Sequence, residues 1–357
     1  DDTRAVFCES VANPGGYITD LDAISAISND AGVPLIVDNT VATPYLWRPI
    51  EHGADIVVHS LTKYMGGHGN SVAGVIVDSG KFPWTEHKER FKRLNEPDAS
   101  YHGVVYTEAL GDAAYIGRAR VVPLRNMGAA ISPMNSFMIM QGIETLPVRM
   151  DRHCENAIYV ANYLAEHEKV SWVRYAGLPE HDDYQLLEKY CGGRAASILS
   201  FGIQGGVEAG GRFIDALELF TRLVNIGDAK SLACHPATTT HRQLSPEELK
   251  KAGVSDDLVR LSVGIEHIDD LIADIEDGFY VTEFLGQGPS LVTGDYSRGA
   301  AGFHIINGKL ADPIAEVTIA GNLKDMLMMA VPANDLEFVR GVNAPTIRID
   351  RMTIAGV

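Results

Sequence analysis

A lysine flanked by hydroxyls and followed by glycines stands out at residues 60–69, Ser-Leu-Thr-Lys-Tyr-Met-Gly-Gly-His-Gly. The amine of Lys63 can form a Schiff base with an aldehyde once a less polar setting favours loss of its proton. The hydroxyls of Ser60 and Thr62 suit phosphate oxygens, and the glycines allow close approach of the backbone. The run therefore indicates a Schiff-base cofactor site, although the same composition also suits a surface loop.

Asp38 adds a second chemical group in the same region. It follows the apolar run 34–37, Pro-Leu-Ile-Val, which is typical of a buried strand. A carboxylate at the end of such a strand can pair with a pyridinium nitrogen and so make the ring an electron sink. A lone Asp there can also cap a helix or form a turn. Asp38 and Lys63 together favour the cofactor interpretation.

The motifs around these two residues resemble the Cys/Met-metabolism family of pyridoxal-phosphate (PLP) enzymes. They are Val-Asp-Asn-Thr at residues 37–40, Ala-Thr-Pro at 42–44 and the run at 60–69. The stretches 101–106 and 119–129 are similar to the O-acetylhomoserine sulfhydrylase branch of that family. The resemblance covers residues 1–278 and implies an α/β fold of the aspartate aminotransferase type, fold type I, with a mainly parallel sheet.

The resemblance assigns roles to residues at matching positions. Lys63 is expected to bind the cofactor covalently and to shuttle the substrate α-proton. Asp38 is expected to hold the pyridine nitrogen, Ser60 and Thr62 the phosphate, and Asn13 the ring hydroxyl. All of these roles are implied by the family.

Two further residues match substrate-binding positions. Arg260, in Leu-Val-Arg-Leu-Ser-Val-Gly at 258–264, matches the arginine that clamps the substrate α-carboxylate. A guanidinium suits that task because it donates two parallel hydrogen bonds; a surface ion pair is the alternative. Ser231, at 230–236, matches a residue beside that clamp.

The activity implied is that of a PLP-dependent transferase in methionine biosynthesis. The reaction is γ-replacement on O-acetyl-L-homoserine with sulfide or a thiol, which gives homocysteine or methionine. A γ-lyase and a cystathionine synthase remain open, because Lys63, Asp38 and Arg260 would serve them too. Members of the family are usually tetramers, so a homo-oligomer is expected.

The family has a segment before the position of residue 5 that has no counterpart in this sequence. That segment includes a phosphate-binding loop, an aromatic residue that stacks on the cofactor, and a Tyr/Arg pair that reaches a neighbouring subunit. We therefore expect the sequence to lack its true N-terminus, and whether it binds PLP and is active stays open.

The last part of the chain reads as β-rich and resembles another family. The stretches 280–288, 293–303 and 316–326 are similar to the C-terminal part of the TldD/PmbA family, which includes zinc metalloproteases and their metal-free partners. No His-Glu-x-x-x-His motif is present, so no metal site is expected. The alternative function is a non-catalytic, PmbA-like partner that binds a TldD-like subunit through residues 280–357. A natural fusion, a gene-model error and an engineered chimera all remain open.

The elements that must position these residues follow from periodicity. Strands near residues 5–8, 33–37, 55–58 and 74–77 alternate with helical segments, which indicates a parallel sheet with ligands at the carboxyl ends of its strands. Helices are expected over 105–145, 151–167 and 268–279, and further strands near Trp172, 198–203 and 223–226; the segments 256–263 and 268–279 close the second domain. Three parts follow: a PLP-binding domain at 1–145, a small α/β domain at 146–279 and a β-rich module at 280–357.

Composition narrows the class of protein. The chain has 357 residues, 46% of them hydrophobic, and a formal net charge of −17. Such an acidic chain disfavours nucleic acid and anionic membranes as partners, since both require clustered Lys and Arg. The four cysteines form no CxxC pair, which suits reduced thiols in a cytoplasmic protein.

Overall fold

The computed structural model describes residues 2–239, 255–273, 278–285, 295–306, 309–332, 347–349 and 352–355. The chain divides into two compact units, Asp1–Leu271 and Ile272–Val357. The division falls a few residues before the predicted junction near residue 280. Within the described residues, no helix is long and apolar enough to cross a membrane.

The first sheet of unit 1 has the order β1-β2-β3-β4. Its strands are β1 (Val6–Glu9), β2 (Leu35–Asp38), β3 (Ile56–Ser60) and β4 (Gly74–Asp78). The first three are parallel and β4 is antiparallel to β3, so the predicted, mainly parallel sheet is confirmed. Because β2 and β3 are parallel, their carboxyl ends bring Asp38 and Ser60 to the same edge of the sheet.

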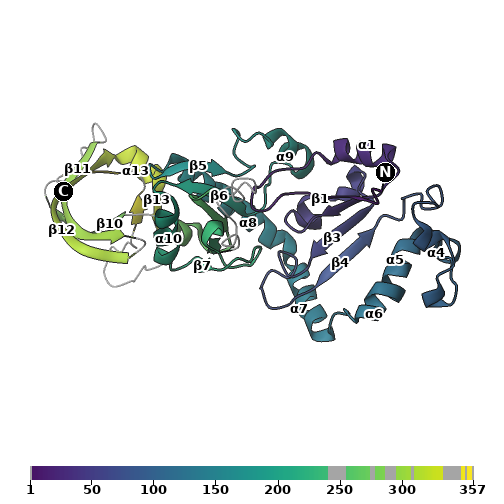
Figure 1. Cartoon of the computed structure of the whole chain (residues 1–357). Coiled ribbons are helices and arrows are strands. Elements are labelled where there is room, and N and C mark those ends of the chain that lie inside the picture. The colour runs from purple at the N-terminus through teal and green to yellow at the C-terminus, as the bar shows by residue number, and fades with distance from the viewer. Residues whose placement is uncertain are drawn as a thin grey trace. The chain divides into compact units, whose positions relative to one another are not determined.

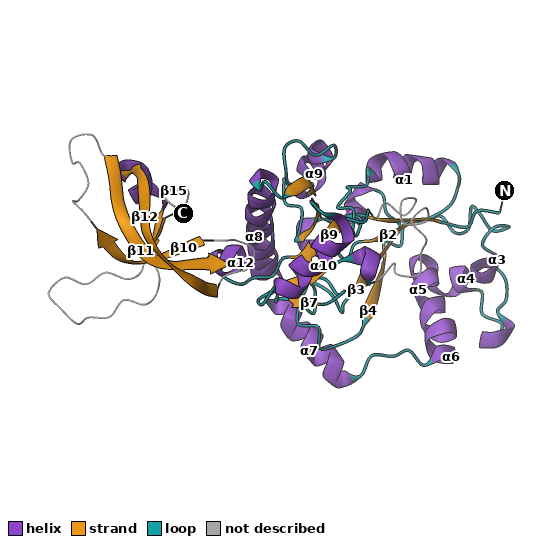
Figure 2. Ribbon diagram, turned by 60° about the vertical axis from the view of Figure 1, so that its left-hand side comes forward, coloured by secondary structure: helices purple, strands orange, loops and turns teal. Residues whose placement is uncertain are grey.

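Helices lie on both sides of this sheet, with α1 on one side and α5 and α6 on the other (Figures 1 and 2). Asp20 caps the first of them, since its Oδ1 accepts a hydrogen bond from the Ala23 amide at 3.4 Å. Pro123 lies in a π-helical turn, Arg120–Leu124. The helices of this region are α1 (Leu21–Asp30), α2 (Thr43–Leu46), α3 (Lys92–Asn95), α4 (Tyr106–Leu110), α5 (Ala114–Ala119) and α6 (Arg125–Met127).

Two longer helices, α7 (Pro133–Glu144) and α8 (Leu146–Glu166), follow in sequence. Ser132 caps α7 by accepting a hydrogen bond from the Asn135 amide, and Pro133 fills the first helical position, where no amide hydrogen is needed. One face of α8 is buried, including Met150, Ala157, Val160 and Leu164. The amphipathic pattern predicted for 151–167 is therefore confirmed, and the helix begins one turn earlier.

The second sheet of unit 1 has the order β5-β6-β9-β8-β7. Neighbouring strands are antiparallel except β7 and β8, which are parallel. Helices α9 (Tyr184–Cys191) and α10 (Gly206–Ala216) belong to this region, and α12 (Ile268–Ala273) spans the boundary between the units. The strands are β5 (Val170–Arg174), β6 (Ile198–Ile203), β7 (Thr221–Arg222), β8 (Leu232–Cys234) and β9 (Leu258–Ser262).

The strand predicted at 223–226 is wrong in position, because β7 ends at Arg222. The carbonyl groups of Val224 and Asn225 accept hydrogen bonds from the guanidinium of Arg260. The guanidinium of Arg260 thus supplies hydrogen bonds that a neighbouring strand would otherwise supply. The backbone at Val224 and Asn225 therefore lies outside the sheet.

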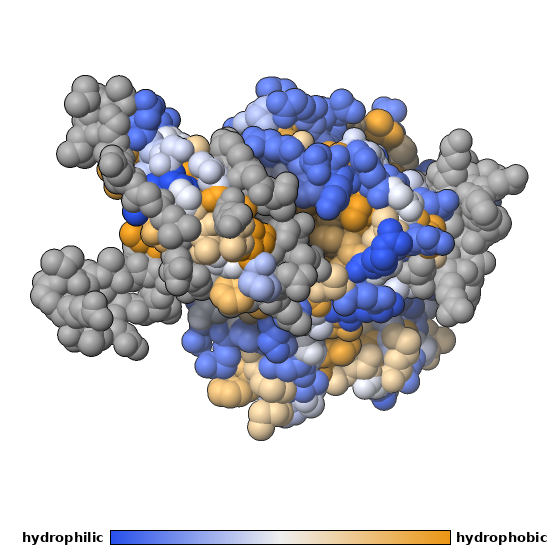
Figure 3. All heavy atoms as spheres, turned by 90° about the vertical axis from the view of Figure 1, so that its left-hand side faces the viewer, coloured by the Kyte–Doolittle hydropathy of each residue, from blue (hydrophilic) through white to orange (hydrophobic). Residues whose placement is uncertain are grey.

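Unit 2 is β-rich, as predicted, and contains an antiparallel sheet in the order β10-β11-β12-β15. Ala300, Val317 and Ile319 form its buried core. Phe284, Leu327, Met328 and Ile347 are exposed, and Figure 3 shows apolar surface on the face of this unit turned to the viewer. Its elements are β10 (Gly278–Leu285), β11 (Asp295–Ile306), β12 (Lys309–Asn322), α13 (Leu323–Met329), β13 (Ala330–Pro332), β14 (Ile347–Ile349) and β15 (Thr353–Ala355).

The helix predicted over 268–279 is wrong at its end. Residues 274–277 lie outside the described residues, and Gly278 and Phe279 belong to β10, where they pair with Ile305 and His304. Helical periodicity continues to this point in the sequence, but pairing with β11 satisfies the backbone instead. Glycine also weakens a helix interior, which disfavours continuation of the helix through Gly278.

Candidate active site

Lys63 lies in a tight turn directly after β3. The Lys63 amide donates to the Ser60 carbonyl at 3.2 Å, and the Gly67 amide donates to the Lys63 carbonyl at 2.7 Å. The Ser60 amide donates to Thr40 Oγ1 at 2.8 Å, which ties the end of β3 to the residues that follow β2. The lysine is therefore held by backbone hydrogen bonds at the carboxyl edge of the sheet.

A buried arginine on α8, Arg149, holds this turn by hydrogen bonds to its backbone carbonyl groups. Its Nη1 donates to the Tyr64 carbonyl at 2.7 Å, and its Nη2 donates to the Gly142 carbonyl at 2.6 Å and the Met65 carbonyl at 3.3 Å. Only 4% of Arg149 is exposed. Sequence reasoning missed this residue; the available signal was an arginine at the spacing of the buried face of α8, which also carries His153 and Asn156.

The loop before β8 packs directly on the lysine turn. The Ala229 amide donates to the Gly67 carbonyl at 2.8 Å. Gly227 has φ +70°, and a Cβ there would lie 2.7 Å from the Tyr64 amide nitrogen. Only glycine allows both this conformation and this approach. In this arrangement Lys63 Nζ donates a hydrogen bond to Asn225 Oδ1.

Arg260 on β9 faces the same loop. Its Nη2 donates to the Asn225 carbonyl at 3.2 Å, and its Nη1 donates to Asn13 Oδ1 at 3.3 Å. Arg260 is 7% exposed, and its Nε has no hydrogen-bond acceptor within the described residues. Three predicted site residues, Lys63, Arg260 and Asn13, are thus connected by hydrogen bonds through Asn225 and Arg260.

The surroundings of Lys63 favour its neutral amine. Burial lowers the pKa of Lys63, and the positive charge of Arg260 lowers it further. A positive neighbour disfavours the ammonium form, and so does a setting with little water. This is the electrostatic condition that a lysine nucleophile requires.

Asp38 and Ser60 are the last residues of β2 and β3, and they lie on the same face of the sheet. Asp38 pairs with Val58, and Ser60 is two positions after Val58, so both share the face of Val58. Asp38 Oδ1 accepts a hydrogen bond from the Thr40 amide at 2.9 Å. Thr40 therefore bonds to both Asp38 and Ser60, a role that sequence reasoning did not assign to it. The predicted contacts of Asp38 with a pyridine nitrogen and of Ser60 with a phosphate stay predictions.

The other two predicted hydroxyls hold loops in this structure. Thr62 Oγ1 donates to the Ala73 carbonyl at 3.3 Å and accepts from the Ala73 amide at 3.1 Å. Ser231 is fully buried; its Oγ donates to Glu266 Oε2 at 2.9 Å and accepts from the Gly264 amide at 2.7 Å. The structure does not join Ser231 to the hydrogen bonds of Arg260, and its predicted substrate contact stays a prediction.

The residues present suit PLP in two respects. A lysine with a lowered pKa supplies the amine, and Asp38 keeps its second oxygen outside the hydrogen bond to Thr40. For the carboxylate of an amino acid, Arg260 has a guanidinium whose Nε finds no acceptor among the described residues. Among the described residues, no group of three or more His, Cys, Asp or Glu side chains could hold a metal ion.

Comparison with known families gives two matches. A profile of the Cys/Met metabolism PLP-dependent enzymes matches residues 1–280. A profile of the PmbA/TldA metallopeptidase C-terminal domain matches residues 218–356. Both resemblances predicted from the sequence are therefore confirmed, and the two matches overlap at residues 218–280.

Relatives of known name agree with the first match. An O-acetyl-L-homoserine sulfhydrylase of Leptospira meyeri is 50% identical over 286 residues, covering 78% of this chain and 64% of the relative. A homocysteine synthase of Schizosaccharomyces pombe is 48% identical over 282 residues, covering 79% of this chain and 66% of the relative. The chain thus spans just under two thirds of the length of these relatives.

A crystal structure shows the same fold. It is that of a Campylobacter jejuni protein described as an O-acetylhomoserine (thiol)-lyase carrying a pyridoxyl-lysine monophosphate residue. The two chains superimpose with a TM-score of 0.73 at 41% identity, over 77% of this chain and 66% of the other. The predicted fold of type I is confirmed.

Proposed function

Because the chain belongs to the Cys/Met metabolism PLP-dependent enzyme family, we propose that it catalyses γ-replacement on O-acetyl-L-homoserine. Sulfide or a thiol enters and acetate leaves, so that a carbon–sulfur bond replaces the γ-carbon–oxygen bond. The product is homocysteine, or methionine when the thiol is methanethiol. The relatives named above as sulfhydrylase and homocysteine synthase support this choice of reaction.

The observation that carries the proposal is the connection between Lys63 and Arg260. Asn225 contacts both, through its side-chain oxygen with Lys63 and through its carbonyl with Arg260. A substrate amino acid needs its amine beside Lys63 and its carboxylate beside a guanidinium. In the structure, the amine of Lys63 and the guanidinium of Arg260 both contact the loop that contains Asn225.

Each residue then has a defined task. PLP, when bound, supplies an electron sink for the α-carbon of the substrate. Lys63 takes the α-proton and returns it to the product, since its lowered pKa leaves the amine free to accept a proton. Arg260 binds the α-carboxylate, Asp38 holds a proton on the pyridine nitrogen, and Ser60 and Thr62 bind the phosphate.

The test is cofactor trapping followed by an activity assay. The full chain is incubated with PLP and reduced with borohydride, and its peptides are analysed by mass spectrometry. The expected adduct lies on Lys63 and is absent from Lys63→Ala, and O-acetylhomoserine with sulfide gives homocysteine. An adduct on another lysine, or the absence of one, would contradict the proposal.

The same assay separates the related activities. A γ-lyase releases 2-oxobutanoate and ammonia without added sulfide, and a cystathionine synthase requires cysteine as the sulfur donor. We expect homocysteine to exceed both products. The reasons are the sequence at 101–129 and the names of the relatives.

A second proposal concerns assembly and location. The profile match at residues 218–356 supports the docking of a TldD-like subunit through the tail. It predicts that such a subunit is retained by the full chain and lost when residues 272–357 are removed; retention by the shortened chain would contradict it.

We also propose that the chain forms a homo-oligomer, to be tested by sedimentation. We further propose that it works in a reducing compartment such as the cytoplasm, which the four free cysteines support.

A further inference from the structure

One face of α8 carries three buried polar side chains at helical spacing. They are Arg149, His153 and Asn156, which follow one another along the helix by about one turn. A buried polar side chain needs a hydrogen-bond partner, so the partners of these three show what this face of the helix holds in place. We call the three residues the polar stripe.

The N-terminal end of the stripe bonds to the turn of Lys63 and to α7. The guanidinium of Arg149 bonds to the carbonyl groups of Tyr64 and Met65 in the turn and to the Gly142 carbonyl in α7. Its Nε donates to Thr145 Oγ1 at 3.2 Å, at the junction of the two helices. A rigid guanidinium fixes several acceptors at once, which the ammonium group of a lysine on its flexible stem does not.

The last turn of α7 also touches the lysine turn directly. A Cβ at Gly142 would overlap the Gly66 carbonyl oxygen and lie 2.8 Å from the Met65 carbonyl oxygen. Only glycine allows this approach, since every other residue has a Cβ. The turn therefore rests on the backbone of α7 and is fastened to it by the guanidinium.

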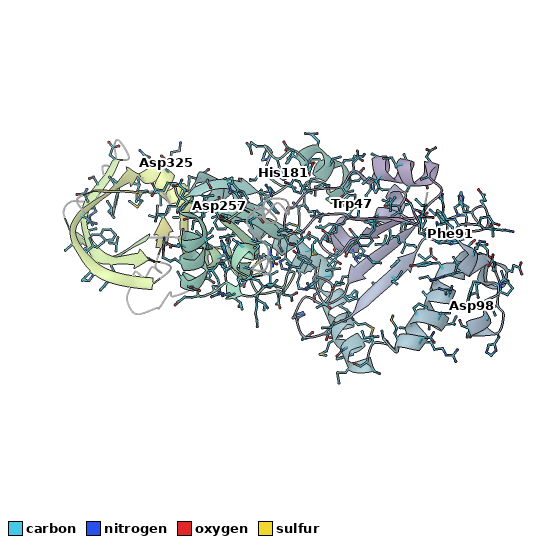
Figure 4. The ribbon with its side chains drawn as sticks, in the orientation of Figure 1. Trp47, Phe91, Asp98, His181, Asp257 and Asp325 are labelled. Carbon is cyan, nitrogen blue, oxygen red and sulfur yellow. The ribbon has the colours of Figure 1, made fainter. Side chains whose placement is uncertain are left out.

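The C-terminal end of the stripe bonds to the chain directly after β9, the strand of the predicted carboxylate clamp. Asn156 Nδ2 donates to the Gly264 carbonyl at 3.0 Å, and His153 Nδ1 donates to the Val263 carbonyl at 2.7 Å. Asp257, labelled in Figure 4, lies directly before β9 and shows where this strand begins. The end of β9 is thus fastened to α8.

The two ends of the stripe hold the two groups that a substrate amino acid would contact. Arg149 fastens the turn of Lys63, and Asn156 fastens the strand of Arg260. The two stripe residues are seven positions apart on one helix. An α-helix rises about 1.5 Å per residue and changes length little, so the helix sets a fixed separation between the two fastened segments.

We propose that the residues of the polar stripe are positioning residues for the γ-replacement, which set how far the amine of Lys63 lies from the guanidinium of Arg260. A substrate held by its carboxylate on Arg260 presents its α-proton at one place, and the amine must reach that place. None of the three stripe residues needs to touch the substrate. This role rests on the proposed function, whereas the hold of Arg149 on the turn can be measured without it.

The kinetic experiment compares variants at the two ends of the stripe. Arg149→Lys keeps the charge and loses the rigid set of donors, and Asn156→Leu keeps the size and loses the hydrogen bonds. With O-acetylhomoserine and sulfide, each should lower kcat about 100-fold, the effect of a displacement of about 1 Å. KM for O-acetylhomoserine should change little, because Arg260 still binds the carboxylate, so kcat and kcat/KM fall together.

Methylation of Lys63 by formaldehyde and borohydride tests the hold on the turn without the cofactor. The rate is measured by mass spectrometry of the Lys63 peptide, with the exposed Lys230 as internal standard. In Arg149→Lys the turn is released and the amine leaves Asn225, so Lys63 should be methylated faster than in the unmodified chain. The two rates therefore move in opposite directions, since methylation rises while kcat falls.

Val160→Ala is the matched control. Val160 lies on the same buried face of α8, about one turn beyond Asn156. The substitution removes buried apolar volume and should lower stability in urea, while kcat and the methylation of Lys63 stay unchanged. Thr145→Val is the mildest variant, because it removes only the hydroxyl that accepts from Arg149 Nε. It covers failure of the other variants to fold, and it should shift both rates in the same directions by less.

The outcomes separate this role from the proposed function. If the unmodified chain forms no PLP adduct on Lys63, the proposed function fails and the role of the stripe fails with it. A normal adduct with equal methylation of Lys63 in Arg149→Lys and the unmodified chain overturns the stripe alone. A rise in KM at unchanged kcat, or an equal loss of kcat in Val160→Ala, overturns it too.

Discussion

At the scale of single residues, the candidate site depends on the charge next to Lys63. Burial and the guanidinium of Arg260 both lower the pKa of this lysine. Arg260 thereby keeps the amine of Lys63 neutral at lower pH, and in the proposed reaction it has a second, separate task, the binding of the substrate carboxylate. The two can be tested separately. Binding of a carboxylate depends on the planar shape of the guanidinium, whereas the effect on the Lys63 pKa depends on its positive charge alone.

Replacing Arg260 with methionine should raise the pKa of Lys63. Removal of a positive neighbour stabilises the ammonium form, so reaction of Lys63 with PLP should require a higher pH. The measurement is the pH dependence of borohydride-trapped PLP on the Lys63 peptide. Arg260→Lys keeps the charge and should leave the midpoint near its original value.

Arg222→Met is the matched control, because Arg222 is an exposed arginine that pairs with Asp215 outside the site. A midpoint that stays in place in Arg260→Met, or that moves equally in Arg222→Met, would show that Arg260 does not set the pKa of Lys63.

Which residues could be predicted depends on the range of their contacts. Lys63 and Asp38 were found because a buried strand precedes each of them, a signal contained within a few neighbouring positions. Arg149 and Asn225 were not found, because their partners lie 85 and 162 positions away in the chain. Thr40 was missed although it is close in sequence, since its bond to the Ser60 amide crosses from β2 to β3.

At the scale of elements, the site is formed by two loops that pack against each other. The turn after β3 and the loop before β8 share hydrogen bonds, and Gly227 allows them to touch. Periodicity placed the strands of the first sheet correctly, since each is a short apolar run with turn residues around it. It failed at 223–226 and 278–279, where Arg260 and β11 respectively decide the backbone conformation.

Gly227→Ala should destabilise unit 1 and weaken PLP trapping at Lys63. The new Cβ would lie 2.7 Å from the Tyr64 nitrogen at a φ of +70°, so the loop must move. We expect a loss of about 1–3 kcal/mol in the free energy of unfolding. Tryptophan fluorescence during urea denaturation measures this.

Gly211→Ala provides the comparison. Gly211 lies inside α10, and a Cβ there would meet no atom within 4 Å. This substitution should be neutral or stabilising by up to about 1 kcal/mol, because alanine favours a helix. Equal effects of the two substitutions would argue against close packing of the two loops.

At the scale of the whole molecule, two units of different make-up share one chain. Unit 1 contains two sheets with buried cores, and all three tryptophans, Trp47, Trp84 and Trp172, lie in it. The described core of the sheet in unit 2 consists of Ala300, Val317 and Ile319, with partly buried neighbours. A core of this size gives little hydrophobic stabilisation.

The two units should therefore unfold in separate transitions. Circular dichroism reports on both units, whereas tryptophan fluorescence reports on unit 1 alone. In urea, we expect circular dichroism to change first at a concentration where fluorescence is still native. Coincident transitions by both probes would show that the chain unfolds as one cooperative body.

The edge strand β1 bears on how the protein is handled. Among the strands that the structure describes, it pairs only with β2, and Phe7 on it is 62% exposed. An open edge of this kind recruits strands from other molecules and so promotes aggregation. The net charge of −17 opposes this by mutual repulsion. Salt shortens the reach of that repulsion to about 10 Å at 0.1 M, so concentrated preparations should stay clear longest in buffers of low ionic strength above the isoelectric point.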